Sequence, residues 1–171
     1  MKPTSALLPH GGVILLPPGN RIDHEAELCI VIGRRASRVP EAQALDYVLG
    51  YTCGNDVSHR DYQRKDGQWV RAKGFDTFCP LGPVIATDLD PNDLAIQSRL
   101  NGEVRQNSRT SNMIFSPVFL VSFISNVMTL EPGDVIMTGT PEGVGPMQPG
   151  DTIEVEIEGI GTLRNTTRAR D

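Results

Sequence analysis

The sequence predicts one α+β domain, rich in β-structure, that spans residues 1–171. Glycine and proline occur 17 and 13 times, so the regular elements between them must be short. Two segments have the pattern of β-hairpins and two that of helices, but strands and helices do not alternate as they do in a βαβ domain. The 39% of apolar residues is enough for a core of ordinary size.

The first half of the chain is expected to hold a buried strand, a helix and a second strand. Residues 28–32 (LCIVI) form a continuous apolar run closed by a glycine, which is typical of a buried strand. Residues 40–49 begin with proline, which favours the first turn of a helix, and a glycine follows them. Residues 51–53 then predict a strand that runs into Gly54-Asn55-Asp56.

Two β-hairpins are expected in the second half of the chain. Residues 96–100 and 103–106 flank Asn101-Gly102, the strongest two-residue turn signal. Residues 152–157 and 161–165 flank a three-residue turn and alternate between apolar and polar side chains. Each hairpin therefore supplies two antiparallel strands to the predicted sheets.

A helix is expected between the hairpins, over residues 117–127. Ser116 precedes it as an N-cap and proline stands at the first helical position. Its segment, VFLVSFISNV, is apolar enough to be buried on more than one side. Gly133-Asp134 and Gly150-Asp151 each follow a proline and precede an apolar run, so each is expected to be a turn before a strand.

Charge and composition exclude several classes of protein. The 16 basic and 21 acidic residues leave a net charge of -5, which argues against a nucleic-acid partner. No apolar run approaches the roughly 20 residues of a membrane span, and the N-terminus has no stretch that suits a signal peptide. Cys29, Cys53 and Cys79 are an odd number without metal-ligand spacing, which favours reduced thiols. A cytoplasmic protein without a membrane partner is expected.

Glu25 and Glu27 lie at the start of the predicted buried strand, in the segment HEAELCIVIG. Because a strand repeats every two residues, both carboxylates project from the same face. Two anions so close repel each other, so both stay ionised only if a cation lies between them. The alternative is a solvated strand end with two exposed acids.

Asp56, Arg60 and Gln63 follow the second predicted strand at spacings of four and three residues. On a helix they would share one face. A carboxylate, a guanidinium and an amide on one face suit a site that binds a metal together with an anionic substrate. The alternative is a turn in which Asn55 and Asp56 bond only to the local backbone.

Two further segments carry candidate site residues. Lys73, one of only three lysines, stands between apolar and aromatic residues in WVRAKGFDTFCPLGP. It either extends to solvent along an apolar surface or faces an anionic site as a partly buried cation. Residues 138–145 (TGTPEGVG) form a glycine-rich loop in which Gly139 and Thr140 offer an N–H and a hydroxyl to a carboxylate. The loop lacks the lysine and helix of a phosphate-binding loop.

The order of the motifs is more specific than any one of them. It runs HEAELCIVIG, ALDYVLGYTCGNDVSHRDYQ, GQWVRAKGFDTFCPLGP, LNGEVRQNSRTSNMIF, MTLEPGDVIMTGTPEGVGPMQPGD and VEIEGIGTLRN. In this order the chain resembles the fumarylacetoacetate hydrolase family over residues 2–165. The resemblance implies the mixed β-roll of that family's catalytic domain.

The resemblance also implies a role for each candidate residue. Glu25, Glu27 and Asp56 match the ligands of a divalent cation, usually Mg²⁺ or Mn²⁺ and in some members Ca²⁺, which suits a hard ion with oxygen ligands. Lys73 matches a lysine that faces the metal and would steady an enolate or oxyanion. The other matches are to residues that approach or hold the substrate: Arg60, Gln63, Gly139 and Thr140.

The resemblance implies a small 2-oxo or enol acid as substrate, and a homodimer. The leading hypothesis is a metal-dependent hydrolase that cleaves a C–C bond in 2,4-dioxo acids such as acylpyruvates, by way of a metal-chelated enolate. One alternative is an isomerase or decarboxylase of related 2-hydroxy-diene or 2-oxo diacids in aromatic catabolism. The other is a non-catalytic domain that binds a metal and an anion.

One departure from the family pattern bears on the reaction. Many members carry an upstream segment with an NYxxH-type motif and a glutamate, which closes as a lid and supplies the His–Glu pair that activates water. The sequence begins at Met1-Lys2-Pro3, and His10 is not in that motif. This raises the weight of the reactions that need no water, or leaves His59 as a substitute proton carrier. Otherwise ordinary structural roles are expected for His10, His24 and His59.

Overall fold

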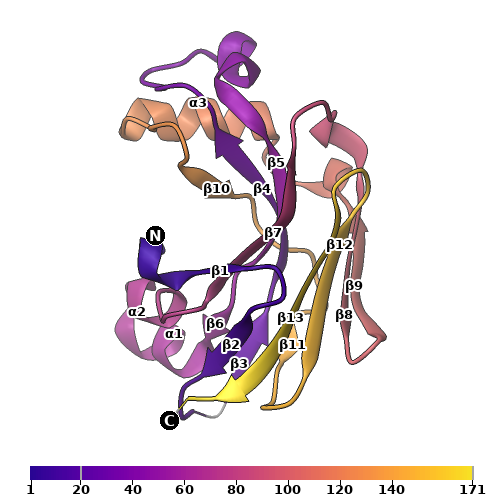
Figure 1. Ribbon diagram of the computed structural model, residues 1–171. Coiled ribbons are helices and arrows are strands. Elements are labelled where there is room, and N and C mark those ends of the chain that lie inside the picture. The colour runs from indigo at the N-terminus through magenta and orange to yellow at the C-terminus, as the bar shows by residue number, and fades with distance from the viewer. Residues whose placement is uncertain (20, 171) are drawn as a thin grey trace.

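Figure 1 shows a computed structural model of the chain, in which residues 1–19 and 21–170 are described. Three sheets make up most of the molecule. The strands are β1 (Leu7–Pro9), β2 (Val13–Leu16), β3 (Ile22–His24), β4 (Ala26–Ile32), β5 (Val48–Asn55), β6 (Ser58–His59), β7 (Cys79–Ala86), β8 (Ala95–Leu100), β9 (Glu103–Arg109), β10 (Val135–Met137), β11 (Gly145–Pro146), β12 (Thr152–Ile157) and β13 (Gly161–Ala169). The α-helices are α1 (Arg60–Asp66), α2 (Val70–Lys73) and α3 (Pro117–Val127). Four short 3-10 segments complete the described elements: η1 (Thr4–Ala6), η2 (Glu41–Tyr47), η3 (Pro91–Asp93) and η4 (Thr110–Asn112).

The sheets are mixed, as the family resemblance of the ordered motifs implied. One five-stranded sheet has the order β1-β7-β5-β4-β10, and the other has the order β2-β13-β12-β8-β9. In each of them one edge strand is parallel to its neighbour, β1 to β7 and β2 to β13, while the remaining pairs are antiparallel. A small sheet has the order β11-β3-β6, and its strands are interspersed along the chain with those of the large sheets. The fold class is therefore the predicted one, α+β and rich in β-structure.

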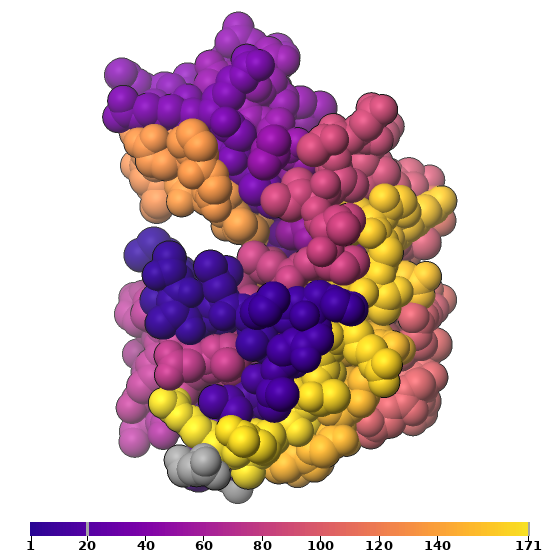
Figure 2. Space-filling view, in the orientation of Figure 1, coloured from indigo at the N-terminus to yellow at the C-terminus, as the bar shows by residue number. Residues whose placement is uncertain are grey.

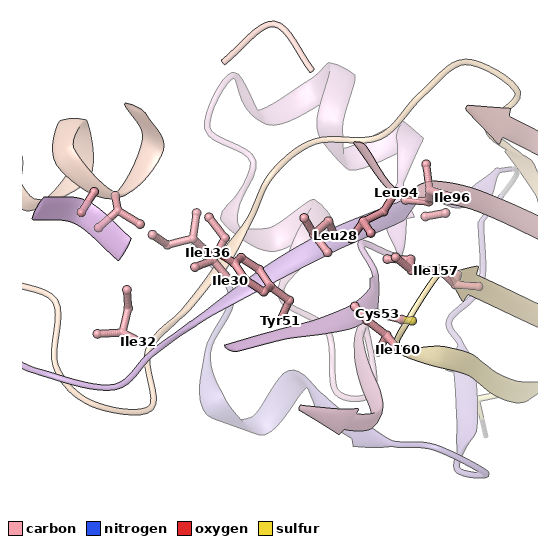
Figure 3. Packing of buried hydrophobic residues seen from close by; sticks show 14 of the residues in the cluster. Leu28, Ile30, Ile32, Tyr51, Cys53, Leu94, Ile96, Ile136, Ile157 and Ile160 are labelled. Atoms are coloured by element: carbon pink, nitrogen blue, oxygen red, sulfur yellow. The ribbon is translucent and has the colours of Figure 1, made fainter. Parts of the chain in front are cut away.

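The main core fills the space between the two large sheets. Every residue of β4 is buried, which explains why its sequence is a continuous apolar run after Glu27. Figure 3 shows Leu28 and Ile30 from β4 close to Tyr51 and Cys53 from β5, with Ile157 of β12 on the far side. A second, smaller cluster around Phe78 closes the other end of the domain.

Both predicted hairpins are confirmed. Asn101 and Gly102 join β8 to β9 with φ angles of 53° and 83°, the left-handed conformation that a tight hairpin turn requires. The pair β12–β13 extends further than expected, because β13 continues to Ala169 and pairs there with β2. The turns at 133–134 and 150–151 also precede strands as predicted, β10 and β12.

The helix predicted over residues 40–49 is wrong in type and in its end. A 3-10 segment, η2, covers Glu41–Tyr47, and β5 already begins at Val48. Pro40 precedes the segment as its N-cap, with an extended backbone at φ -69° and ψ 148°, and does not lie in the first turn as expected. Pairing of β5 with β4 draws Val48 and Leu49 into the sheet, so the sheet overrides the local helical pattern.

Helix α3 has the predicted bounds and N-cap, but only one of its sides is buried. The Ser116 side chain accepts a hydrogen bond from the N–H of Phe119. Val121 and Ser125 are buried, and Ser125 Oγ accepts from the N–H of Val39 at 3.0 Å. Phe123, on another side of the helix, is 57% exposed. The expectation of burial on more than one side therefore fails for the single chain.

Figure 2 shows a deep notch in the surface of the molecule. Helix α3 and the residues around β10 form one wall, and the N-terminal segment forms the other, with α2 below it. The strands β4, β5 and β7 run behind the notch, so residues at their ends can open into it.

Candidate metal and substrate site

The structure brings three carboxylates together. Glu25, Glu27 and Asp56 each offer an oxygen, and these oxygens lie within 4.8 Å of one another. Glu25 and Glu27 are buried, and the side chain of Asp56 is only 15% exposed. The three residues predicted as metal ligands therefore form one cluster, and the alternative of exposed acids at a strand end does not fit the structure.

Strand pairing explains how distant residues meet there. Ala26 pairs with Asn55 in the antiparallel pair β4–β5, so Glu25 comes opposite Asp56. The N–H of Asp56 donates to the carbonyl oxygen of Glu25 at 2.9 Å. Asn55 adds a second tie, because its Oδ1 accepts from the N–H of Glu25 at 2.9 Å. Glu25 itself lies at the break between β3 and β4, where the chain passes from the small sheet to a large one.

Asp56 does not share a helix with Arg60 and Gln63. Helix α1 begins at Arg60, and Asp56 lies before it in the link from β5 to β6. The predicted common helix face is therefore wrong for Asp56, although the three residues still reach the same site. Arg60 contacts Glu25 directly, and Glu25 shares the cluster with Asp56.

Two lysines are paired with the carboxylates. Lys73 Nζ lies 2.7 Å from Glu25 Oε2 and 2.5 Å from Asp56 Oδ2. Lys2 Nζ lies 2.7 Å from Asp56 Oδ1 and also donates to the carbonyl oxygens of Lys73 and Phe78, both at 2.6 Å. Burial alone would lower the pKa of Lys73, but the charges and hydrogen bonds of Asp56 and Glu25 outweigh it and raise the pKa. Lys73 is therefore a cation at neutral pH, as an anionic site requires.

Arg60 is held on the opposite side of Glu25. Its Nη2 donates to Glu25 Oε1 at 2.6 Å, its Nε to Asp23 Oδ2 at 2.8 Å and its Nη1 to Gln63 Oε1 at 2.7 Å. Asp23 is fully buried; desolvation would raise its pKa, but Arg21 and Arg60 together lower it, so it stays ionised. The guanidinium is thus engaged by three side chains, and the Gln63 amide nitrogen remains for a ligand.

Glu27 is the carboxylate most affected by burial. Its pKa is raised to about 8, first by desolvation and then by the neighbouring charge of Asp56. Its Oε2 accepts a hydrogen bond from the N–H of Gly139 at 2.8 Å. Pairing of Met137 with Cys29 in the antiparallel pair β10–β4 places Gly139 opposite Glu27. The N–H assigned to substrate from the sequence is therefore used to hold Glu27.

Thr140 follows at the rim of the same loop and is half-buried. Its Oγ1 accepts a hydrogen bond from Gln106 Nε2 at 2.7 Å. Gln106 is 1% exposed and lies on β9, a strand of the other large sheet. The loop thus joins the carboxylate cluster on one side and the second sheet on the other.

The three histidines lie outside the carboxylate cluster. The ring of His59 packs against Tyr62 and Phe75, and its Nε2 lies 3.3 Å from the carbonyl oxygen of Pro18. His24 is buried beside Gln106, and burial lowers its pKa. His10 accepts from the N–H of Arg164. These contacts fit the expected structural roles and give no support to His59 as a proton carrier at the cluster.

The donor set fits a hard divalent cation. Carboxylate oxygens are the preferred ligands of Mg²⁺, Mn²⁺ and Ca²⁺. Asp56 Oδ1 is buried, and its ion pair with Lys2 Nζ at 2.7 Å lacks the direction of a hydrogen bond, so a lone pair remains for a ligand. Glu25, Glu27 and Asp56 would hold such an ion, and among the residues that the structure describes the cluster contains carboxylates alone.

Sequence reasoning missed three residues of this site, namely Lys2, Asp23 and Gln106. Lys2 had a signal, because it is one of only three lysines in the chain. Asp23 stands two residues before Glu25 and so shares its strand face, which extends the pattern of alternating acids. Gln106 had no local signal, since its partners are up to 82 residues away in the sequence.

No helix in the described part of the chain is long and apolar enough to cross a membrane.

A model of a known protein family matches nearly the whole chain. The model describes the C-terminal domain of fumarylacetoacetate (FAA) hydrolase and matches residues 1–168. The mitochondrial oxaloacetate tautomerase FAHD1 of Pongo abelii is 43% identical over 96% of this chain and 77% of its own length. The family resemblance inferred from the ordered motifs is therefore confirmed.

Solved structures agree closely with the fold. The crystal structure of a 5-carboxymethyl-2-hydroxymuconate delta-isomerase from Mycobacterium smegmatis has a TM-score of 0.98 and 56% identity, over 99% of this chain and 68% of that chain. A maleylpyruvate hydrolase from Sphingobium sp. SYK-6, in complex with manganese(II) and pyruvate, has a TM-score of 0.92 and 38% identity, over 99% of this chain and 64% of that chain. This chain thus spans about two thirds of the length of these solved chains.

Proposed function

Because the chain belongs to the fumarylacetoacetate hydrolase family, we propose that residues 1–171 act as one metal-dependent catalytic domain on small 2-oxo or enol acids. One observation carries the proposal: the Lys73 ammonium lies between two carboxylates of a buried acidic cluster. A cation held beside a divalent-metal site suits a reaction in which negative charge develops on a substrate oxygen.

Glu25, Glu27 and Asp56 are the proposed ligands, and Mg²⁺ or Mn²⁺ is the proposed ion, with Ca²⁺ as an alternative. The manganese in the related maleylpyruvate hydrolase supports a divalent cation at this place. The bound ion would supply Lewis-acid stabilisation of charge on an oxygen of the substrate. Lys2 and Arg60 hold two of the ligands in place from the outside of the cluster.

Lys73 is the proposed electrostatic catalyst. Its raised pKa keeps the ammonium charged, so it acts as a fixed cation rather than as a general base. It steadies an enolate oxygen of the substrate, which forms whenever a proton leaves the carbon next to the 2-oxo group. Thr140 and the amide nitrogen of Gln63 are proposed to bind the carboxylate and the distal oxygen of the substrate, with Arg60 as their neighbour.

Isomerisation or tautomerisation of a 2-oxo acid is the reaction that we favour within this class. Its support is that the isomerase from Mycobacterium smegmatis, at 56% identity, is more similar to this chain than two solved hydrolases, at 42% and 38%. Hydrolysis of a C–C bond in a 2,4-dioxo acid is the second candidate, and the maleylpyruvate hydrolase supports it. Isomerisation passes through an enolate after a proton leaves carbon 3, and hydrolysis leaves the same kind of enolate when the C–C bond breaks, so the site described here serves either.

A second copy of the chain is the proposed protein partner. A row of stacked phenylalanine rings runs from Phe115, just before α3, along the exposed side of the helix, with centroids 4.8 Å and 5.7 Å apart for Phe115–Phe119 and Phe119–Phe123. An apolar row of this kind suits a dimer interface. The three free, buried cysteines suit a reducing compartment such as the cytoplasm.

Asp56→Asn tests the proposed metal site. The change removes ligand charge at almost constant volume, so Mn²⁺ affinity should fall at least tenfold while the circular dichroism spectrum stays that of the wild type. Titration of Mn²⁺ followed by electron paramagnetic resonance measures it. Asp88→Asn, on an exposed residue, is the matched control and should bind Mn²⁺ as the wild type does. Equal affinities for Asp56→Asn and the wild type would contradict the site.

A further inference from the structure

Gln106 occupies a buried junction between the two large sheets and the loop after β10. Its side-chain oxygen Oε1 lies 3.0 Å from the N–H of Ala26, 3.0 Å from Ser98 Oγ and 3.3 Å from His24 Nδ1. Its nitrogen Nε2 lies 2.7 Å from Thr140 Oγ1 and 2.8 Å from the carbonyl oxygen of Pro141. With 1% of the residue exposed, both lone pairs of the amide oxygen and both amide hydrogens are engaged, and His24 Nδ1 is the most distant of the three groups around Oε1.

The backbone partners fix which way the amide points. The N–H of Ala26 can only donate, so it must face the amide oxygen. The carbonyl oxygen of Pro141 can only accept, so it must face the amide nitrogen. A flipped amide would break both bonds inside the core and leave two buried groups unpaired, which is costly.

The orientation determines what the hydroxyl group of Thr140 does. Gln106 Nε2 donates to Thr140 Oγ1, so the hydroxyl hydrogen must point to another acceptor. The loop cannot easily relax away from the strand. A Cβ atom on Gly143 would lie 2.1 Å from the carbonyl oxygen of Arg105, which shows how closely the two backbones approach.

We propose that Gln106 is a positioning residue: by donating to Thr140 Oγ1 it fixes the side chain and keeps the O–H bond free to donate to a carboxylate oxygen of the ligand. The proposal rests on the proposed function, since it needs an anionic ligand beside the metal site.

Oxalate binding in the presence of Mn²⁺ tests the proposal apart from turnover. Gln106→Glu keeps the size and the acceptor but replaces the donor to Thr140 by an oxygen, and Thr140→Val removes the hydroxyl group. Each should weaken oxalate binding about tenfold or more, while Mn²⁺ affinity changes less than threefold. Ser98→Ala, which removes one donor to Oε1 and leaves Nε2 in place, is the matched control and should bind oxalate as the wild type does.

The double variant separates positioning from a general loss of structure. If Gln106 acts through Thr140, the double variant binds oxalate no more weakly than Thr140→Val alone, because the second change removes nothing further. Losses of oxalate affinity that add up in the double variant would overturn the inference. Wild-type oxalate affinity in Thr140→Val would also overturn it, and that result does not depend on how Gln106→Glu folds. A wild-type protein that binds Mn²⁺ but not oxalate would overturn the proposed function itself.

Discussion

At the scale of single residues, the candidate site is an alternation of buried charges. Asp23, Glu25 and Asp56 are each in contact with a cation, and Arg60 and Lys73 each bridge two carboxylates. Removing one member of such a network leaves an uncompensated buried charge, which costs more than the pair contributes. The site residues therefore hold one another in place before any ligand arrives.

The pH dependence of metal binding follows from Glu27. Its pKa of about 8 means that it is mostly protonated at pH 7, and a cation must displace that proton to use the carboxylate. Apparent Mn²⁺ affinity should therefore rise as the pH increases from 6.5 to 8.5 and level off above the pKa. Isothermal titration calorimetry at three pH values measures the affinity. Repeating it in two buffers of different ionisation enthalpy counts the protons released on binding. An affinity that does not change over this range would contradict the assignment of Glu27 as a ligand.

Lys73→Met separates the catalytic role of the ammonium from a structural one. The variant keeps the length and volume of the side chain but removes its charge, so kcat should fall by about 100-fold, since electrostatic groups of this kind contribute on this scale. Mn²⁺ affinity should change by much less than kcat, because Lys73 is not a ligand. Steady-state kinetics and a metal titration on the same preparation give the two numbers. Equal losses in both would make Lys73 a structural counter-charge.

Local sequence predicted part of this network. The period-two spacing placed Glu25 and Glu27 together, and the isolated Lys73 in an apolar segment was recognisable as an unusual cation. The contacts of Lys2 with Asp56 and of Gln106 with Thr140 join residues 54 and 34 positions apart. Such contacts depend on the packing of whole strands, which no local pattern reports.

At the scale of elements, α3 shows how a single helix can be predicted well and still be misread. Its bounds follow from Ser116 and the proline after it, and these signals act within one turn. Its apolar content predicts burial within the chain, but Phe123 and Val127 are 57% and 67% exposed. The helix expected over residues 40–49 is wrong because local signals did not decide its end. Pairing of β5 with β4 decides instead where the strand begins.

The exposed row on α3 predicts the oligomeric state. Phe123→Glu places a charge in the middle of the apolar row, so a homodimer should dissociate to monomers at micromolar concentration. Light scattering after size-exclusion chromatography measures the mass. Val104→Glu, on an exposed valine of β9 away from α3, is the matched control and should leave the mass unchanged. A monomeric wild type, or a dimer that survives Phe123→Glu, would contradict the proposed interface.

At the scale of the whole molecule, the candidate site lies where separate parts of the fold meet. Glu25 follows β3 of the small sheet, and Glu27 belongs to β4 of one large sheet. Gln106 lies on β9 of the other large sheet and contacts the loop that carries Thr140. A cation bound by Glu25, Glu27 and Asp56 would therefore tie these parts together. Anything that binds the native state and not the unfolded chain stabilises the native state by mass action.

Metal binding should therefore raise the thermal stability of the protein. At a Mn²⁺ concentration of 100 times Kd, the free energy of unfolding increases by about 2.7 kcal/mol, which corresponds to a rise in Tm of roughly 5–10 °C for a domain of this size. Differential scanning calorimetry with Mn²⁺ and with EDTA measures the shift. Asp56→Asn should lose most of it and Asp88→Asn should keep it. An equal shift in both variants would place the bound metal elsewhere.

The fold as a whole was more predictable than the site. Two hairpins, one helix and one buried strand follow from local patterns, and the ordered motifs extend these to the complete β-roll. The parallel edge strands β1 and β2 did not follow, because each pairs with a distant segment, as in Leu7 with Cys79 and Val13 with Thr166. The site depends on those long-range pairings, so its full set of contacts appears only in three dimensions.

The most direct test of the central claim is hydrogen–deuterium exchange at carbon 3 of a 2-oxo acid, followed by proton NMR in D₂O with Mg²⁺. Exchange reports the enolate, which isomerisation and tautomerisation form by loss of a proton and which C–C hydrolysis releases and must protonate. We expect the wild type to catalyse the exchange, and EDTA, Asp56→Asn or Lys73→Met to reduce it to near the rate without protein. Exchange by the wild type no faster than without protein, although Mn²⁺ and oxalate both bind, would contradict the claim and leave a binding domain without catalysis.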